Sequence, residues 1–115
     1  ISYKMLDTDF KFGKVQILAE QVAASTDKVH FKNIFENTNG GVSLLAFRQS
    51  QALAEHLAPA EVMVYVVEGE VEFTMADMKH SLRMGEFFLM GQGVAHSVAA
   101  KTDAKVMLVK IKSDK

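Results

Sequence analysis

Short apolar runs separated by Gly, Asn or Asp dominate the chain from about residue 28 onward. The alternation is most regular in residues 70–75, where polar residues separate Val71, Phe73 and Met75. A period of two places the apolar side chains of a strand on one face. Strands are therefore expected in residues 28–37, 41–47, 61–68, 70–75 and 104–112, with three short ones ending at residue 83 and lying within 85–93 and 94–100.

Two of the expected strands carry further information about burial. The run from Val62 to Val67 is continuously apolar. Such a run indicates a strand buried on both faces, or one whose second face a partner subunit covers. In residues 104–112, Val106, Leu108 and Lys110 fall on one face of the alternation. The opposite face carries Lys105, Met107, Val109 and Ile111.

Turn residues divide the runs and indicate the class of fold. Residues 37–41 combine Asn and Gly, and Gly69 separates Glu68 from Glu70. Gly and Asn tolerate positive φ, which tight turns between strands require. Residues 15–25 alone have helical composition and are expected to form a helical turn or a leading strand. The chain is therefore predicted to be an all-β sandwich or barrel.

Composition limits the organisation and the partners. The 115 residues, 49% hydrophobic and 23% charged, suit one globular domain spanning residues 1–115. The net charge is −1 without any Lys/Arg run, so neither nucleic acid nor a membrane is an expected partner. No apolar run approaches a membrane span or a signal peptide, so a cytoplasmic location is expected. The absence of cysteine excludes disulfides and thiolate chemistry.

Two segments, VYVVEGEVEF and GEFFLMGQGVAH, resemble the two motifs of the cupin superfamily. Aligned on the first motif, Gly69 is the closing glycine and His56 falls on the first histidine. In the second motif, Gly85, Gly93 and His96 match at the expected spacing. Fifteen residues separate Gly69 from Gly85, the short spacing typical of small bacterial cupins. The resemblance implies a double-stranded β-helix, or jelly-roll barrel, and covers roughly residues 41–112.

Five positions depart from the motifs. Ser50 stands in place of the first glycine, Ala58 of the second histidine, Val62 of the glutamate, Gly91 of the proline and Ala100 of the asparagine. The segment around residue 56 resembles a subgroup of small cupins that reads His-x-Ala-Pro. The resemblance therefore implies a barrel without the full set of metal ligands.

The resemblance places His56 and His96 in the central pocket, as the tentative ligands of one divalent Fe, Mn, Ni, Cu or Zn ion. Two imidazoles alone leave such an ion mostly bound to water, so weak affinity or no metal is expected. Glu61 precedes the glutamate position by one residue, so alternation points it outward unless a β-bulge near Pro59 reverses it. Tyr65 is either a core residue or a hydrogen-bond donor lining the pocket.

Two functions are compatible with these residues. The missing ligands favour a barrel that binds a small molecule and has a weak or incomplete metal site. The retained histidine pair favours the alternative, a metal-dependent oxygenase, isomerase or decarboxylase acting on a small organic acid. The resemblance also implies a homodimer, because small cupins commonly pair.

Overall fold

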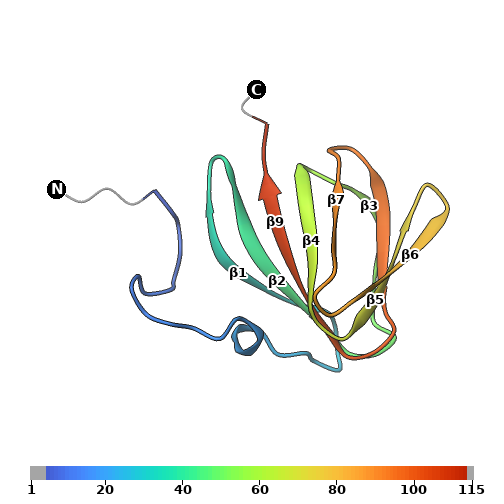
Figure 1. Ribbon diagram of the computed structural model, residues 1–115, viewed down its shortest axis with the longest axis horizontal. Helices are drawn as coiled ribbons and strands as arrows, with labels where there is room; N and C mark the ends of the chain where they lie inside the picture. Colours follow the sequence, from blue (N-terminus) through green and yellow to red (C-terminus); the bar gives the residue numbers. More distant parts are fainter. Residues whose placement is uncertain (1–4, 114–115) are drawn as a thin grey trace.

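A computed structural model describes residues 5–113, which form nine strands and one short 3-10 turn, η1 (Leu18–Gln21) (Figure 1). The helical turn falls within the segment of helical composition. The strands are β1 (His30–Asn37), β2 (Gly40–Phe47), β3 (Ala52–Leu57), β4 (Glu61–Glu68), β5 (Glu70–Met75), β6 (Met78–Arg83), β7 (Phe87–Met90), β8 (Ala95–Ala100) and β9 (Ala104–Ile111).

Eight of these strands lie where the short apolar runs predict them, and β3 is the exception. In β3 only Leu53 is half-buried, while the other side chains are exposed. The strand lies at the edge of its sheet, and its register against β8 shifts between Leu53 and His56. An exposed and irregular edge strand lacks the burial that produces a hydrophobic alternation, so its sequence carries little strand signal.

Two sheets pack face to face and form the barrel (Figure 1). One has the order β1-β2-β9-β4-β7 and the other the order β3-β8-β5-β6, and every neighbouring pair is antiparallel. Strands that are neighbours in a sheet are often distant in sequence, as β2 and β9 are. This order is that of an all-β jelly-roll barrel, as the sequence predicts.

The core lies between the sheets and contains alternate residues of β4 and β5. Val62, Val64 and Val66 of β4 are at most 4% exposed, and they face Val71 and Phe73 of β5, which are equally buried. Full burial of an aliphatic side chain contributes about 1.5–3 kcal/mol to stability. The two sheets are therefore held together chiefly by the inward residues of each strand.

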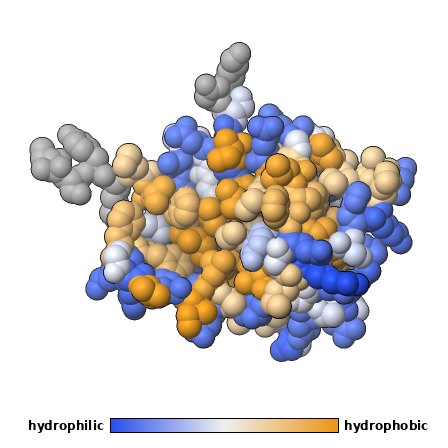
Figure 2. All heavy atoms as spheres, viewed as in Figure 1, coloured by the Kyte–Doolittle hydropathy of each residue, from blue (hydrophilic) through white to orange (hydrophobic). Residues whose placement is uncertain are grey.

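The outer face of the five-stranded sheet is only partly covered. The N-terminal segment packs Leu18 and Val22 over Leu44, Val67 and Met107, forming a second apolar cluster. Beyond that cluster the sheet presents exposed apolar residues, and Figure 2 shows hydrophobic atoms gathered across this middle region of the molecule. The N-terminal segment of the chain thus covers part of the outer face of this sheet. The apolar run of β4 suggests that this face is buried.

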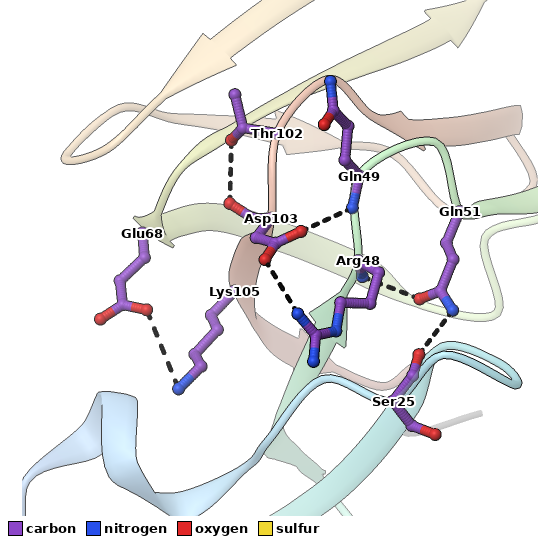
Figure 3. Close-up of polar contacts among 8 residues, drawn as sticks. All are labelled: Ser25, Arg48, Gln49, Gln51, Glu68, Thr102, Asp103 and Lys105. Carbon is purple, nitrogen blue, oxygen red and sulfur yellow. Dashed lines mark hydrogen bonds and ion pairs between the residues drawn. The ribbon is translucent and has the colours of Figure 1, made fainter.

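Polar contacts close the end of the barrel where β2, β4 and β8 finish (Figure 3). Arg48 Nη1 lies 3.4 Å from Asp103 Oδ2, and the backbone N–H of Gln49 donates to Asp103 Oδ1 at 2.8 Å. The side-chain amide of Gln51 donates to the carbonyl of Ser25 at 2.6 Å, which ties the N-terminal segment to this end. The opposite end of the barrel carries the cavity.

Candidate functional site

The pairing of β3 with β8 brings the two predicted histidines together. His56 near the end of β3 and His96 near the start of β8 are cross-strand partners. Their ring centroids lie 4.1 Å apart, with 60° between the ring planes. Cross-strand partners share a face of the sheet, so both imidazoles lie on the same side. His56 is exposed and His96 is only 5% exposed, so the pair extends from the surface into the barrel.

Backbone carbonyls orient both imidazole rings. Nδ1 of His56 lies 3.0 Å from the carbonyl oxygen of Ala54, and Nδ1 of His96 lies 3.1 Å from that of Val94. A carbonyl oxygen can only accept, so each Nδ1 carries the proton and donates it. In a neutral ring, Nε2 then keeps its lone pair. Each histidine therefore offers one nitrogen that can accept a hydrogen bond or ligate a metal.

Burial lowers the pKa of His96 below its usual value, because the imidazolium loses hydration inside the barrel. The hydrogen bond to the Val94 carbonyl opposes this shift, and the neighbouring His56 adds to it. His96 is therefore neutral over a wider pH range than a histidine in water. Its Nε2 stays an acceptor at neutral pH.

This depressed pKa predicts a pH-dependent stability. Below pH about 6.5 the unfolded chain binds a proton at His96 more readily than the folded chain does, so acid favours unfolding. We expect the free energy of unfolding to fall as the pH drops through this range, and the fall to be smaller in His96→Gln. Urea unfolding at several pH values measures it. His80→Gln, at an exposed position on β6, is the control, and an equal change in both variants would contradict the assignment.

The histidine pair opens onto a cavity of about 200 Å³ inside the barrel. Most of the lining is apolar and comes from both sheets, so the cavity is a local opening in the core. The lining residues are Leu45, Leu53, His56, Leu57, Ala58, Pro59, Val62, Phe73, Met90, His96, Val98, Leu108 and Lys110. Such a pocket, apolar with a few convergent polar groups, is the usual form of a small-molecule site.

The cavity includes two positions where the cupin motif expects ligands and this chain has none. Ala58 and Val62 both line it, and they are 2% and 4% exposed. Glu61 lies outside it, in a hollow on the outer face of the sheet beside Met63. The pairing of β4 with β9 keeps its register from Glu61 to Val66, so no bulge turns the carboxylate inward.

Tyr65 is absent from the cavity lining. It is opposite Phe87 of β7 and Met107 of β9, on the same outer face as Met63. Alternation within β4 explains this, because Val64 and Val66 point inward and the residue between them points outward. Of the predicted site residues, the structure thus brings His56 and His96 together at the cavity. Glu61 and Tyr65 lie on the outer face of the five-stranded sheet, away from the cavity.

The side chains that line the cavity do not supply enough ligands for a complete metal site. Within residues 5–113, no group of three or more His, Cys, Asp or Glu is arranged to hold a metal ion. The described lining offers two imidazoles and no carboxylate to offset the charge of a cation. First-row metals in proteins usually take three or four protein ligands. The residues present therefore do not fit a tightly held Fe, Mn, Ni, Cu or Zn ion.

Lys110 is a charged lining residue that neither cupin motif includes. It lies near the end of β9, opposite Val62 of β4 and Gly41 of β2, and its side chain is half-buried. A signal for it existed, because alternation puts Lys110 on the same face as Leu108. What the alternation alone does not reveal is that this part of the face borders a cavity.

The two antiparallel sheets and the cavity between them define a small jelly-roll barrel. The family model described as the cupin domain matches residues 44–112, and the chain belongs to this family. The cupin resemblance is thus confirmed, while the His-x-Ala-Pro subgroup stays a prediction. In residues 5–113 there is no helix of the length and apolar character that crossing a membrane requires.

Individual relatives agree with this assignment. Protein SchB of Streptomyces halstedii is 32% identical over 73 residues, which are 63% of this chain and 53% of that protein. The chain thus spans about half the length of this curated relative. A conserved protein of unknown function from Streptococcus pyogenes superposes with a TM-score of 0.88 at 19% identity, with both chains fully covered.

A cupin conserved-barrel protein from Leptotrichia buccalis is 27% identical, with a TM-score of 0.77 over 83% of this chain and 46% of that one. A cupin superfamily protein from Desulfitobacterium hafniense has a TM-score of 0.85 at 17% identity, over 92% of this chain and 97% of the other. At such identities the structural likeness establishes the fold and leaves the activity open.

Proposed function

We propose that this cupin binds a small molecule in its barrel and that its metal site is weak or incomplete. The observation that carries the proposal is the composition of the cavity, where Ala58 and Val62 stand at ligand positions beside His56 and His96. An apolar lining favours binding through the burial of ligand surface. The two Nε2 atoms then serve as hydrogen-bond acceptors that orient the ligand.

A binding experiment without metal tests this proposal. In the presence of a chelator, we expect small apolar fragments to shift the NMR signals of cavity residues, because burial in an apolar pocket needs no cation. Val62→Phe should abolish these shifts by filling the cavity. Met63→Phe is the matched control, since the neighbouring side chain lies on the outer face and lines no part of the cavity.

A metal titration separates this proposal from the metal-dependent enzyme. We expect protein purified without a histidine tag to carry no stoichiometric transition metal, and Zn, Mn, Fe, Ni and Cu to bind weakly. Stoichiometric metal that is lost in both His56→Ala and His96→Ala would overturn the proposal and favour the oxygenase, isomerase or decarboxylase. That alternative is supported by the Nε2 lone pairs that the Nδ1 hydrogen bonds of His56 and His96 leave available for ligation.

A homodimer is also proposed, through the uncovered outer face of the five-stranded sheet. Phe87, Leu89 and Ile111 on this face are 59%, 70% and 60% exposed. Large exposed apolar patches commonly mark interfaces. A monomer in sedimentation at micromolar concentration would contradict this proposal. A cytoplasmic location stays a prediction from the sequence.

A further inference from the structure

Lys110 extends from β9 toward the interior of the barrel. Its cross-strand partners are Val62 and Gly41, and Val62 lines the same cavity. Gly41 has no side chain, and beyond it the side chain of Glu36 on β1 packs over the glycine. Lys110 also borders the neighbouring hollow formed along β1 and β2. The lysine thus lies where the cavity meets the mouth of the barrel.

The ammonium of Lys110 lacks a partner in the part of the chain that the structure describes. Of the three half-buried lysines in residues 5–113, Lys32 lies over the ring of Phe10 and Lys105 pairs with Glu68. No ion pair or hydrogen bond joins the Lys110 side chain to another described residue. Neither Asp nor Glu is among the described lining residues. Glu36 lines the neighbouring hollow that Lys110 also borders, but no ion pair joins the two side chains. Within the described lining of the cavity itself, Lys110 therefore has no carboxylate to offset its charge.

We propose that the ligand of this cavity is a small organic anion, with a carboxylate that pairs with Lys110 Nζ and an apolar body inside the barrel. This inference rests on the proposed binding function and specifies its ligand class. A lysine ammonium offers three donors and a full charge, and charge-assisted hydrogen bonds are about twice as strong as neutral ones. The apolar residues opposite it exclude water from the rest of the ligand.

The size of the cavity limits the apolar body. A cavity of about 150 Å³ accommodates benzene, so the 200 Å³ here accommodates one ring with a carboxylate at the mouth. Benzoate is therefore a suitable probe. Benzamide is its neutral counterpart of nearly equal shape. The difference between their affinities isolates the contribution of charge.

Calorimetric titration of the full chain with benzoate and benzamide tests the proposal. We expect benzoate to bind at least about 10-fold more tightly than benzamide, the low end of what a charged hydrogen bond contributes. Lys110→Gln should remove this preference, and Lys110→Arg should largely retain it. Lys112→Gln is the matched control, because it removes the same charge from an exposed residue that lines only the neighbouring hollow.

The outcomes separate this inference from the proposed function. Equal binding of benzoate and benzamide, abolished by Val62→Phe, would overturn the anion preference and leave the binding function standing. Equal losses in Lys110→Gln and Lys112→Gln would also overturn it, since the effect would then come from net charge. Binding of neither probe would count against both. Thermal unfolding of each variant confirms that the barrel is intact.

Discussion

Introducing the two missing ligands, Ala58→His and Val62→Glu, should raise the affinity of the barrel for Zn or Mn by about 100-fold or more. Both positions line the cavity beside His56 and His96. The backbone at Ala58 is held to the neighbouring loop, because its N–H donates to the Val94 carbonyl at 3.0 Å and its carbonyl accepts from Gly93 N–H at 2.8 Å. These two hydrogen bonds hold the backbone of residue 58 in place, so an introduced histidine side chain has a defined origin.

The expected size of this effect follows from coordination chemistry. Three imidazoles and a carboxylate supply a four-ligand site and offset the charge of the cation, whereas two imidazoles do neither. Even an outer group that only orients a ligand changes metal affinity about 10–100-fold, so two direct ligands should do at least as much. Calorimetric titration with each metal, against the wild-type chain, gives the ratio of affinities.

A control tests whether the gain in metal affinity depends on the face of β4 that carries the carboxylate. Ala58→His combined with Met63→Glu adds the same groups but places the carboxylate on the outer face, where Glu61 already lies. We expect this variant to gain much less affinity. The variant with Val62→Glu should also unfold more easily without metal, because it buries an unpaired carboxylate, and should regain stability when metal is added. Equal affinities in the two variants would contradict the placement of Val62.

Gly69→Ala should destabilise the barrel by about 3 kcal/mol or more, a large part of the roughly 5–15 kcal/mol that holds a domain folded. Gly69 joins β4 to β5 with φ of +78°, a conformation that L-residues rarely adopt. A Cβ there would lie 2.1 Å from the backbone oxygen of Asp103 and 2.7 Å from Thr102 Oγ1. The backbone of the 101–103 turn would have to move. We expect the melting temperature to fall by about 10 °C or more.

Gly85→Ala is the matched control for this prediction. Gly85 has a similar φ of +86°, but no atom lies within 4 Å of a Cβ built there. It should therefore cost only the backbone strain, about 1–2 kcal/mol. Chemical unfolding gives the loss of unfolding free energy in each variant. The difference between the two losses is the part due to the contact with Asp103. Equal losses of stability in the two variants would mean that backbone strain alone accounts for both, and would contradict the role of the contact with Asp103.

Much of this barrel was predictable because its strands are half-buried. Val71 and Phe73 alternate with polar residues, and the structure buries them as the pattern requires. Gly69 and Gly85 mark turns with positive φ, as their residue type suggests. The strand β3 was not predictable in this way, because an exposed edge strand has no buried face to reveal it.

The sequence by itself determined the all-β class and the cupin family, because turn residues and spaced motifs are local features of the chain. It also predicted which face each residue of β9 occupies, whereas the continuously apolar run of β4 left the place of Tyr65 open. Only the tertiary structure decided which residues of other strands lie next to each of these faces. The pairing of β3 with β8 brought His56 against His96, and the pairing of β9 with β4 placed Lys110 beside Val62 at the cavity. Long-range pairing depends on contacts among all the strands, which no local pattern encodes.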